Sequence, residues 1–240
     1  MKAMVFAAGL GTRLRPHTND RPKALVELNG QSLLEIVLLR LKSFGIDEVV
    51  VNVHHYADMV IDFLARNNNF GLNIHISDER DLLLDTGGAM KKAQALLNDA
   101  PFLIHNVDII SQLDLNKLYE KHLAHNALST LAVSQRKTSR YLQFSDEGHL
   151  VAWRNAKTGE KKVSKVSNSA KDWAYSGIAV IDPSLFRFFP KEKNVFSIID
   201  TWLEAAKTGG LYSFPHDESH WLDVGKPETL TRAEVMLRGH

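Results

Sequence analysis

The sequence predicts an α/β fold in three layers, with a doubly wound and mostly parallel sheet at its centre. Short apolar runs of strand length alternate with segments of helical spacing through the first two thirds of the chain. The apolar runs are continuous, as in strands buried on both faces, and the first one ends in a glycine-rich turn. Strands separated by helical segments of this length imply right-handed crossovers and a mostly parallel, doubly wound sheet.

The elements follow one another in order. The first is a strand at 3–8, which ends at Gly9. Ser32 stands three residues before Glu35, a spacing typical of a helix N-cap, and Gly45 ends that helix. Further strands are predicted at 48–53, 72–76, 102–105 and 129–133, and further helices at 57–67, 86–97 and 113–123.

The pattern changes after the fifth strand. Residues 136–170 are polar and rich in lysine, and they predict a β-hairpin flap inserted beside the sheet. A buried strand follows at 175–181, and Asp182-Pro183 then begins a helix in the usual order of cap and proline. The remaining elements are strands at 150–153 and 211–214 and helices at 196–207 and 227–238. We expect one domain over 1–240 that includes the flap.

Composition excludes several classes of function. The chain has 240 residues and no cysteine, which removes disulfides, thiolate nucleophiles, iron–sulfur clusters and cysteine-ligated zinc. The 29 Lys and Arg balance 28 Asp and Glu, and a net charge of +1 argues against a basic nucleic-acid surface. No run approaches the ~20 apolar residues of a membrane span, and no signal peptide is visible. We expect a cytoplasmic monomer or small homo-oligomer with no nucleic-acid or membrane partner.

The strongest chemical signal follows the first strand. The chain reads Ala-Ala-Gly-Leu-Gly-Thr-Arg from Ala7 to Arg13, and Pro22-Lys23 comes shortly afterwards. The two glycines let the backbone approach a bulky anion and adopt positive φ without a steric cost. Successive N–H groups in such a turn bind anions, and three arginines and Lys23 add positive charge within 13–23. This combination suits a triphosphate.

Other phosphate-binding motifs fit the same segment poorly. A dinucleotide site requires a third glycine where this chain has Leu14, so hydride chemistry loses support. The P-loop pattern of glycine, lysine and serine or threonine is absent. A glycine-rich turn with incidental surface arginines remains open, although the preceding strand and the Pro-Lys pair disfavour it.

The residues from Phe6 to Thr18 and from Pro22 to Leu25 resemble the signature of the sugar nucleotidyltransferases, the NDP-sugar pyrophosphorylases, with Ala24 in place of a proline. The resemblance implies a Rossmann-like, GT-A-like nucleotidyltransferase fold with the β-rich insertion on the sugar side. It implies that the loop wraps the nucleotide phosphates and that Arg13 and Lys23 are catalytic. The implied nucleotide-binding residues in this loop are Ala8, Gly9, Gly11, Thr12 and Arg13.

Three further segments resemble the same family. In Asp85–Ala89, Gly87 and Gly88 would meet the edge of a pyrimidine base. In His105–Asp108, the resemblance makes Asn106 a substrate-binding residue and Asp108 a ligand of Mg²⁺, with Val107 where the family has glycine. In Trp221–Pro227, it makes Asp223 the second metal ligand. Carboxylate oxygens are also the ligands that Mg²⁺ prefers.

The sugar side carries a weaker signal. The segment from Tyr175 to Ile178 resembles the family strand whose glycine, here Gly177, lies close to the bound sugar. Arg140 and Asn155 stand where the family contacts the sugar or its phosphate. We therefore expect Asn106, Arg140, Asn155 and Gly177 to bind the sugar 1-phosphate.

Among its relatives, the chain resembles the compact branch of N-acetylmuramate-1-phosphate uridylyltransferases of peptidoglycan recycling, most closely in 77–93. This resemblance implies that UTP and a sugar 1-phosphate give a UDP-sugar and pyrophosphate. A mannose-1-phosphate guanylyltransferase, a thymidylyltransferase and a cytidylyltransferase stay open. So do a silent nucleotide-sugar binding module, which Val107 would favour, and a glycosyltransferase, since Asn106-Val107-Asp108 half matches Asp-x-Asp.

Overall fold

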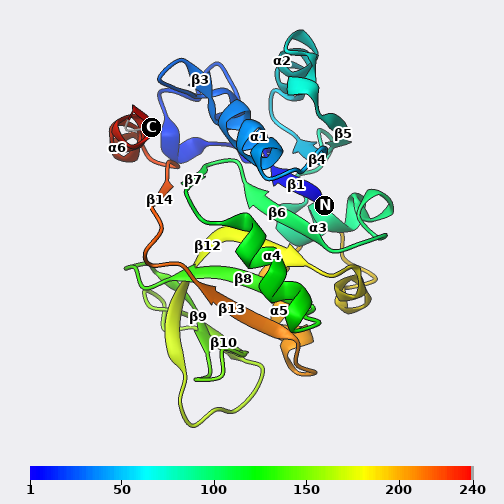
Figure 1. Cartoon of the computed structure of the whole chain (residues 1–240), viewed down its shortest axis with the longest axis vertical. Coiled ribbons are helices and arrows are strands. Elements are labelled where there is room, and N and C mark those ends of the chain that lie inside the picture. The colour runs from blue at the N-terminus through cyan, green and yellow to red at the C-terminus, as the bar shows by residue number, and fades with distance from the viewer. Residues whose placement is uncertain (239–240) are drawn as a thin grey trace. The chain divides into compact units, whose positions relative to one another are not determined.

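A computed structural model describes residues 1–238 and confirms the mixed α/β fold with a central, mostly parallel sheet (Figure 1). These residues form two compact units that alternate along the chain. Unit 1 comprises Met1–Leu83, His105–Gln112 and the described part of His220–His240, and unit 2 comprises Leu84–Ile104 and Leu113–Ser219. The single domain that the sequence predicts over 1–240 stays a prediction. Residues 239 and 240 lie outside the part of the chain that the structure describes.

The sheet of unit 1 is parallel. Strand β1 (Lys2–Phe6) pairs with β4 (Glu48–Val53), and β4 pairs with β5 (Asn73–Asp78). Strand β6 (Phe102–Asn106) passes from unit 2 into unit 1, where the N–H of Val107 donates to the carbonyl of Phe6 at 3.2 Å. Ala3, Met4 and Val5 of β1 and the four valines of β4 are almost fully buried, as their continuous apolar runs predict, whereas Phe6 is partly exposed.

The helices of unit 1 begin where the sequence indicates. In α1 (Leu33–Ser43), the hydroxyl of Ser32 accepts the N–H of Glu35 at 3.1 Å, which confirms the predicted cap. The other elements are η1 (Thr12–Leu14), η2 (Lys23–Leu25), β2 (Glu27–Leu28), β3 (Gln31–Ser32), α2 (Ala57–Arg66), η3 (Asn68–Gly71), β7 (Ile109–Ser111), β14 (Trp221–Asp223) and α6 (Pro227–Arg238). Strands β7 and β14 pair antiparallel, which links two distant parts of the sequence.

Unit 2 mixes parallel and antiparallel pairs. Strand β8 (Ser129–Ser134) pairs in parallel with β13 (Leu211–Pro215) and antiparallel with β12 (Lys171–Ile181). The remaining elements are α3 (Asp85–Lys92), η4 (Gln94–Leu96), α4 (Leu115–Ala124), β9 (Arg140–Phe144), β10 (Leu150–Asn155), β11 (Lys161–Val163), η5 (Pro183–Phe188) and α5 (Ile198–Ala206). Helix α4 packs on β8 and β12 (Figure 1). Helix α5 brings the fully buried Trp202 against Tyr175 of β12.

Two sequence predictions need correction in unit 2. Residues 136–170 form the predicted antiparallel hairpin, β9 with β10, and β9 also pairs with the first half of β12, so that the flap strands extend its sheet. Strand β12 accordingly begins at Lys171, four residues before the predicted start. Asp182 caps the N–H of Ser184 at 2.9 Å, as predicted, but the helix that follows is 3₁₀. Within residues 1–238, no helix combines the length and the apolar character that crossing a bilayer requires.

Candidate active site

The loop after β1 is shaped by its second glycine. Gly11 has φ of 65°, the left-handed conformation that glycine adopts without a steric cost. A Cβ at this position would lie 2.9 Å from Thr18 Cγ2 and 3.0 Å from Lys23 Cβ. The carbonyl of Gly11 accepts the N–H of Leu14 and the hydroxyl of Thr18. Gly11 therefore allows a tight turn that lies directly against Lys23.

The first glycine of the loop has a different environment. Gly9 is exposed, and a Cβ there would meet nothing within 4 Å. Thr12 and Arg13, which begin the 3₁₀ helix η1, are exposed as well, whereas Ala8 is buried. The predicted nucleotide-binding residues thus form an open segment from Gly9 to Arg13 on a buried base.

Lys23 and Asp108 form an ion pair. Their side chains are 11% and 13% exposed, so solvent screens the pair only weakly. Lys23 reaches Asp108 from the 3₁₀ helix η2, and Asp108 lies in the turn between β6 and β7. Val107, in the same turn, buries its side chain and leaves Asp108 beside Lys23.

Three predicted site residues meet around Gly225. The position that a Cβ of Gly225 would occupy lies 2.7 Å from Asp223 Oδ1, 2.9 Å from a guanidinium nitrogen of Arg13 and 3.2 Å from Asp108 Oδ2. Asp223 lies opposite Ile109 in the β14–β7 pair, and the N–H of Val224 donates to the carbonyl of Asp108. This pairing brings the two carboxylates together, as the sequence predicts.

Within residues 1–238, no third carboxylate or histidine joins Asp108 and Asp223 in a group that could hold a metal ion. No group of three or more histidine, aspartate and glutamate side chains within residues 1–238 is arranged to hold a metal ion. A cation at this site would therefore take two protein carboxylates, and its other ligands would come from water or from a bound phosphate.

Asn106 and His105 end strand β6 just before Asp108. The Nδ1 atom of His105 lies 2.8 Å from the carbonyl oxygen of Asn106. Burial lowers the pKa of His105 to about 3, and the nearby charge of Arg40 acts in the same direction. His105 is thus neutral at physiological pH.

Gly87 and Gly88 lie in unit 2, at the start of α3. Their N–H groups both donate to the carbonyl oxygen of Phe196, at 2.9 and 3.2 Å. A Cβ on Gly87 would lie 2.4 Å from the Phe196 ring, and one on Gly88 would lie 2.0 Å from the carbonyl oxygen of Asn194. Both glycines are therefore required for packing, and base recognition through them stays a prediction.

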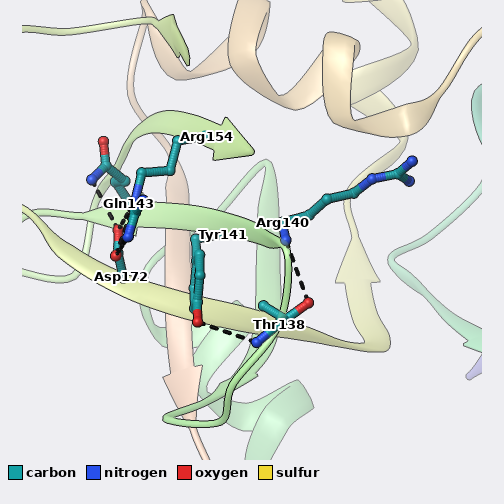
Figure 2. Close-up of polar contacts among 6 residues, drawn as sticks. All are labelled: Thr138, Arg140, Tyr141, Gln143, Arg154 and Asp172. Carbon is teal, nitrogen blue, oxygen red and sulfur yellow. Dashed lines mark hydrogen bonds and ion pairs between the residues drawn. The ribbon is translucent and has the colours of Figure 1, made fainter. Parts of the chain in front are cut away.

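Arg140 and Asn155 are cross-strand partners at the end of the β9–β10 pair. Figure 2 shows that the Arg140 side chain points away from the neighbouring ion pair between Arg154 and Asp172. The Asn155 side chain accepts the N–H groups of Lys157 and Thr158, so it shapes the following turn. The structure brings these two predicted residues together, with only Arg140 extended into solvent.

Gly177 lies in an irregular part of β12. The register with β8 shifts between Tyr175 and Ala179, and Gly177 has φ of 77°. On one side of it, the hydroxyl of the buried Ser176 lies 2.7 Å from Nε2 of His216. Burial lowers the pKa of this histidine. A buried polar contact thus supports the bulge at which Gly177 stands.

Sequence reasoning missed Asn52, which supports the signature loop. Asn52 is the one polar residue in the apolar part of β4, and its side chain is almost fully buried. Its Oδ1 accepts the N–H groups of Ala7 and Ala8 at 2.7 and 3.3 Å. An asparagine inside an apolar strand was the signal that could have identified it.

Two curated proteins are similar in sequence to this chain over nearly its whole length. The chain is 34% identical over 245 residues to the N-acetylmuramate alpha-1-phosphate uridylyltransferase of Caulobacter vibrioides, covering 98% of this chain and 96% of that protein. It is 28% identical to the mannose-1-phosphate guanyltransferase of Yarrowia lipolytica, over 95% of this chain and 61% of that longer protein.

A solved structure supports the same relationship at the level of the fold. HddC from Yersinia pseudotuberculosis, complexed with GMP-PN, matches with a TM-score of 0.78 and 22% identity, over 98% of this chain and 99% of that one. The sequence also matches the nucleotidyl transferase family over residues 2–238. The chain therefore belongs to the nucleotidyl transferase family and is a sugar-1-phosphate nucleotidyltransferase.

Proposed function

We propose that the chain condenses UTP with N-acetylmuramate 1-phosphate to give the UDP-sugar and pyrophosphate. The observation that carries the proposal is the convergence of Arg13, Asp108 and Asp223 around Gly225, with Lys23 paired to Asp108. The choice of uridine and of the muramic sugar is supported by the 34% identity to the Caulobacter vibrioides enzyme over nearly its whole length.

The reaction joins two anions, and this sets the task of the site. An oxygen of the sugar phosphate attacks the α-phosphorus of the nucleotide in line, and the bond from that phosphorus to the β-phosphate breaks, releasing pyrophosphate. Two unit charges 4 Å apart repel by about 4 kcal/mol at an effective dielectric constant near 20. Arg13 and Lys23 offset this repulsion and stabilise the charge that develops on pyrophosphate. No protein nucleophile is required.

The two carboxylates fit a bound Mg²⁺. This ion commonly takes one or two protein carboxylates together with waters and substrate phosphates, and Asp108 and Asp223 offer that set. The missing Cβ of Gly225 leaves space between their oxygens. When bound, Mg²⁺ neutralises phosphate charge. In our proposal these two aspartates hold it, and Lys23 keeps Asp108 in place beforehand.

The remaining contacts are divided between the two substrates. We assign Ala8, Gly9, Gly11, Thr12, Gly87 and Gly88 to the nucleotide, and Asn106, Arg140, Asn155 and Gly177 to the sugar phosphate. The exposed guanidinium of Arg140 and the open Gly9–Arg13 segment support these assignments, because each is accessible to a charged ligand. Since nucleoside triphosphates are used inside cells, we propose the cytoplasm as the compartment and a monomer or small homo-oligomer as the state.

Mannose-1-phosphate guanylyl transfer is the second candidate, supported by the 28% identity to the Yarrowia lipolytica enzyme. A silent binding module loses support, because Val107 does not displace Asp108 from Lys23. A glycosyltransferase would use an Asp-x-Asp motif, and the family match over residues 2–238 favours nucleotidyl transfer instead.

The test is a matrix of the four nucleoside triphosphates against sugar 1-phosphates with Mg²⁺, scored by release of pyrophosphate. We expect the fastest release with UTP and N-acetylmuramate 1-phosphate. Fastest release with GTP and mannose 1-phosphate would replace this proposal by the second candidate. Binding of nucleotide without any release of pyrophosphate would support the binding module.

The same assay tests the two carboxylates. We expect Asp108→Asn and Asp223→Asn each to lower kcat by about 10²-fold or more, since each removes charge from the reacting centre. Asp62→Asn is the matched control, because Asp62 is an exposed aspartate on α2. Unchanged turnover in both site variants would make the two-carboxylate mechanism wrong.

A further inference from the structure

We propose that Asn52, held in place by Glu79, is a positioning residue that presents the Gly9–Arg13 loop to the triphosphate. The inference rests on the proposed function, since it concerns the loop that binds the nucleotide. It adds two residues, on β4 and directly after β5, that no signature motif of this chain contains.

The first step concerns the end of β1. The β1–β4 ladder ends where Phe6 lies opposite Asn52, so Ala7 and Ala8 leave the sheet while they are still buried. Buried N–H groups need acceptors. The Oδ1 atom of Asn52 supplies one for both, at 2.7 Å from Ala7 N and 3.3 Å from Ala8 N. One side-chain oxygen thereby sets the direction in which the chain leaves the strand.

The second step concerns the other end of the same amide. The Nδ2 atom of Asn52 donates to Oε1 of Glu79 at 2.8 Å, and Glu79 is only 1% exposed. The N–H of Glu79 donates to the carbonyl of Val53 at 2.7 Å, and its carbonyl oxygen lies 2.7 Å from His54 Nδ1. Glu79 is therefore held by the last residue of β4 and by the side chain of His54, and it fixes the Asn52 amide in the orientation that turns Oδ1 toward the loop.

The third step concerns the backbone N–H groups that remain available to the triphosphate. Because the Ala7 and Ala8 N–H groups are bound to Asn52, the backbone N–H groups that can meet phosphate begin at the exposed Gly9. A change of the Asn52 amide would move the first residues of the loop. Such a shift weakens nucleotide binding before it affects the sugar phosphate.

Two pairs of variants test the chain of contacts. Asn52→Leu removes the acceptor, and Asn52→Asp keeps an acceptor for the loop but opposes Glu79 with a second carboxylate. Glu79→Met removes the acceptor of the Asn52 amide, whereas Glu79→Gln keeps Oε1 as an acceptor. Ser77→Ala is the matched control, because Ser77 is a buried polar residue of β5 whose hydroxyl has no hydrogen-bond partner within residues 1–238.

The readout is the KM for each substrate, from pyrophosphate release with the substrate pair that the wild type turns over fastest. We expect Asn52→Leu, Asn52→Asp and Glu79→Met to raise KM for the triphosphate by about tenfold or more, with KM for the sugar phosphate within about twofold. We expect Glu79→Gln and Ser77→Ala to resemble the wild type.

A purely structural role would lower kcat through the fraction of folded enzyme and leave both KM values unchanged, and that result would overturn the proposal. So would a Glu79→Gln variant as impaired as Glu79→Met. If Asn52→Leu does not fold, the comparison of Glu79→Met with Glu79→Gln decides. A wild type that releases no pyrophosphate with any pair would instead contradict the proposed function.

Discussion

The ammonium group of Lys23 is paired with the carboxylate of Asp108, 85 residues further along the chain. Both side chains are mostly buried, so neither charge is well solvated by itself. Removing one partner therefore leaves the other as an unpaired, poorly solvated charge, which lowers the stability of the fold. Removing both partners leaves no such charge. We therefore expect the pair to contribute to stability as well as to the proposed reaction, and the two contributions can be separated.

A double-mutant cycle on this pair should separate them. We expect Lys23→Met and Asp108→Asn each to lower the free energy of unfolding by about 1–3 kcal/mol. The double variant should lose less than the sum of the two, while all three variants lose activity. Urea unfolding and pyrophosphate release measure the two effects. Additive losses of stability would show that the two side chains do not interact in solution.

Gly225→Ala should reduce activity with little loss of stability. Gly225 does not have positive φ, so alanine fits its backbone, but the new methyl group would lie 2.7 Å from Asp223 Oδ1. The carboxylates and Arg13 must then move apart. A displacement of about 1 Å at a reacting centre lowers the rate by about 10²-fold. Activity and thermal unfolding are compared with those of Glu228→Gln, an exposed change nearby in α6. Full activity in Gly225→Ala would contradict the close approach of Asp223, Arg13 and Asp108 to Gly225.

Substitution by alanine should affect stability at Gly11 and nucleotide binding at Gly9. Gly11→Ala should lower the free energy of unfolding by about 1–2 kcal/mol, because the left-handed conformation is costly for alanine and Thr18 blocks the methyl group. Gly9→Ala should leave stability unchanged and raise KM for the triphosphate, since only a bound ligand would meet its methyl group. Thermal unfolding and KM distinguish the two; a stable Gly11→Ala variant would contradict the turn described here.

Gly87→Ala should destabilise the protein by about 1–3 kcal/mol through overpacking against Phe196. Because the methyl group meets the ring, Phe196→Leu should relieve part of the loss when the two changes are combined. Gly88→Ala meets the backbone oxygen of Asn194, so no side-chain change should relieve it. Chemical unfolding of the single and double variants measures this coupling. Relief of Gly88→Ala by Phe196→Leu would contradict the packing.

His122 should make stability fall in mild acid. Burial lowers its pKa to about 4 in the folded protein, below its ordinary value of 6.5. Between these values the unfolded chain binds a proton that the native protein does not, so stability is lost as pH falls from 6.5 toward 4. The loss is about 1.4 kcal/mol per pH unit at most. Urea unfolding should show a shallower pH dependence for His122→Gln than for the wild type, and an equal dependence would contradict the buried, neutral His122.

The sequence singled out the candidate site residues but not the residues that support their loop. Arg13, Lys23, Asp108 and Asp223 lie in motifs of several residues, and the structure places their side chains close together. Asn52 and Glu79 are single residues whose importance depends on strand register, since Asn52 acts where the β1 ladder stops. Register follows from pairing between distant segments, and a local pattern does not contain it.

The short range of hydrophobic periodicity also explains why some strands were predicted wrongly or not at all. Strands β7 and β14 have three residues each, too few for any periodicity, although their pairing brings Asp223 to Asp108. The first half of β12, which pairs with β9, is mixed in polarity and only partly buried, so no apolar run marked its start at Lys171. The cap at Ser32 was predictable because it depends only on Ser32 and Glu35.

The alternation of the two units has a consequence for how the enzyme is made. By the time a ribosome has added residue 219, every segment of unit 2 has been synthesised, but unit 1 still lacks β14 and α6. The nascent chain then holds Lys23 and Asp108 without Asp223 and Gly225. Under the proposed mechanism, catalytic competence is therefore acquired late in translation, because a chain that stalls before residue 220 has Asp108 but lacks Asp223.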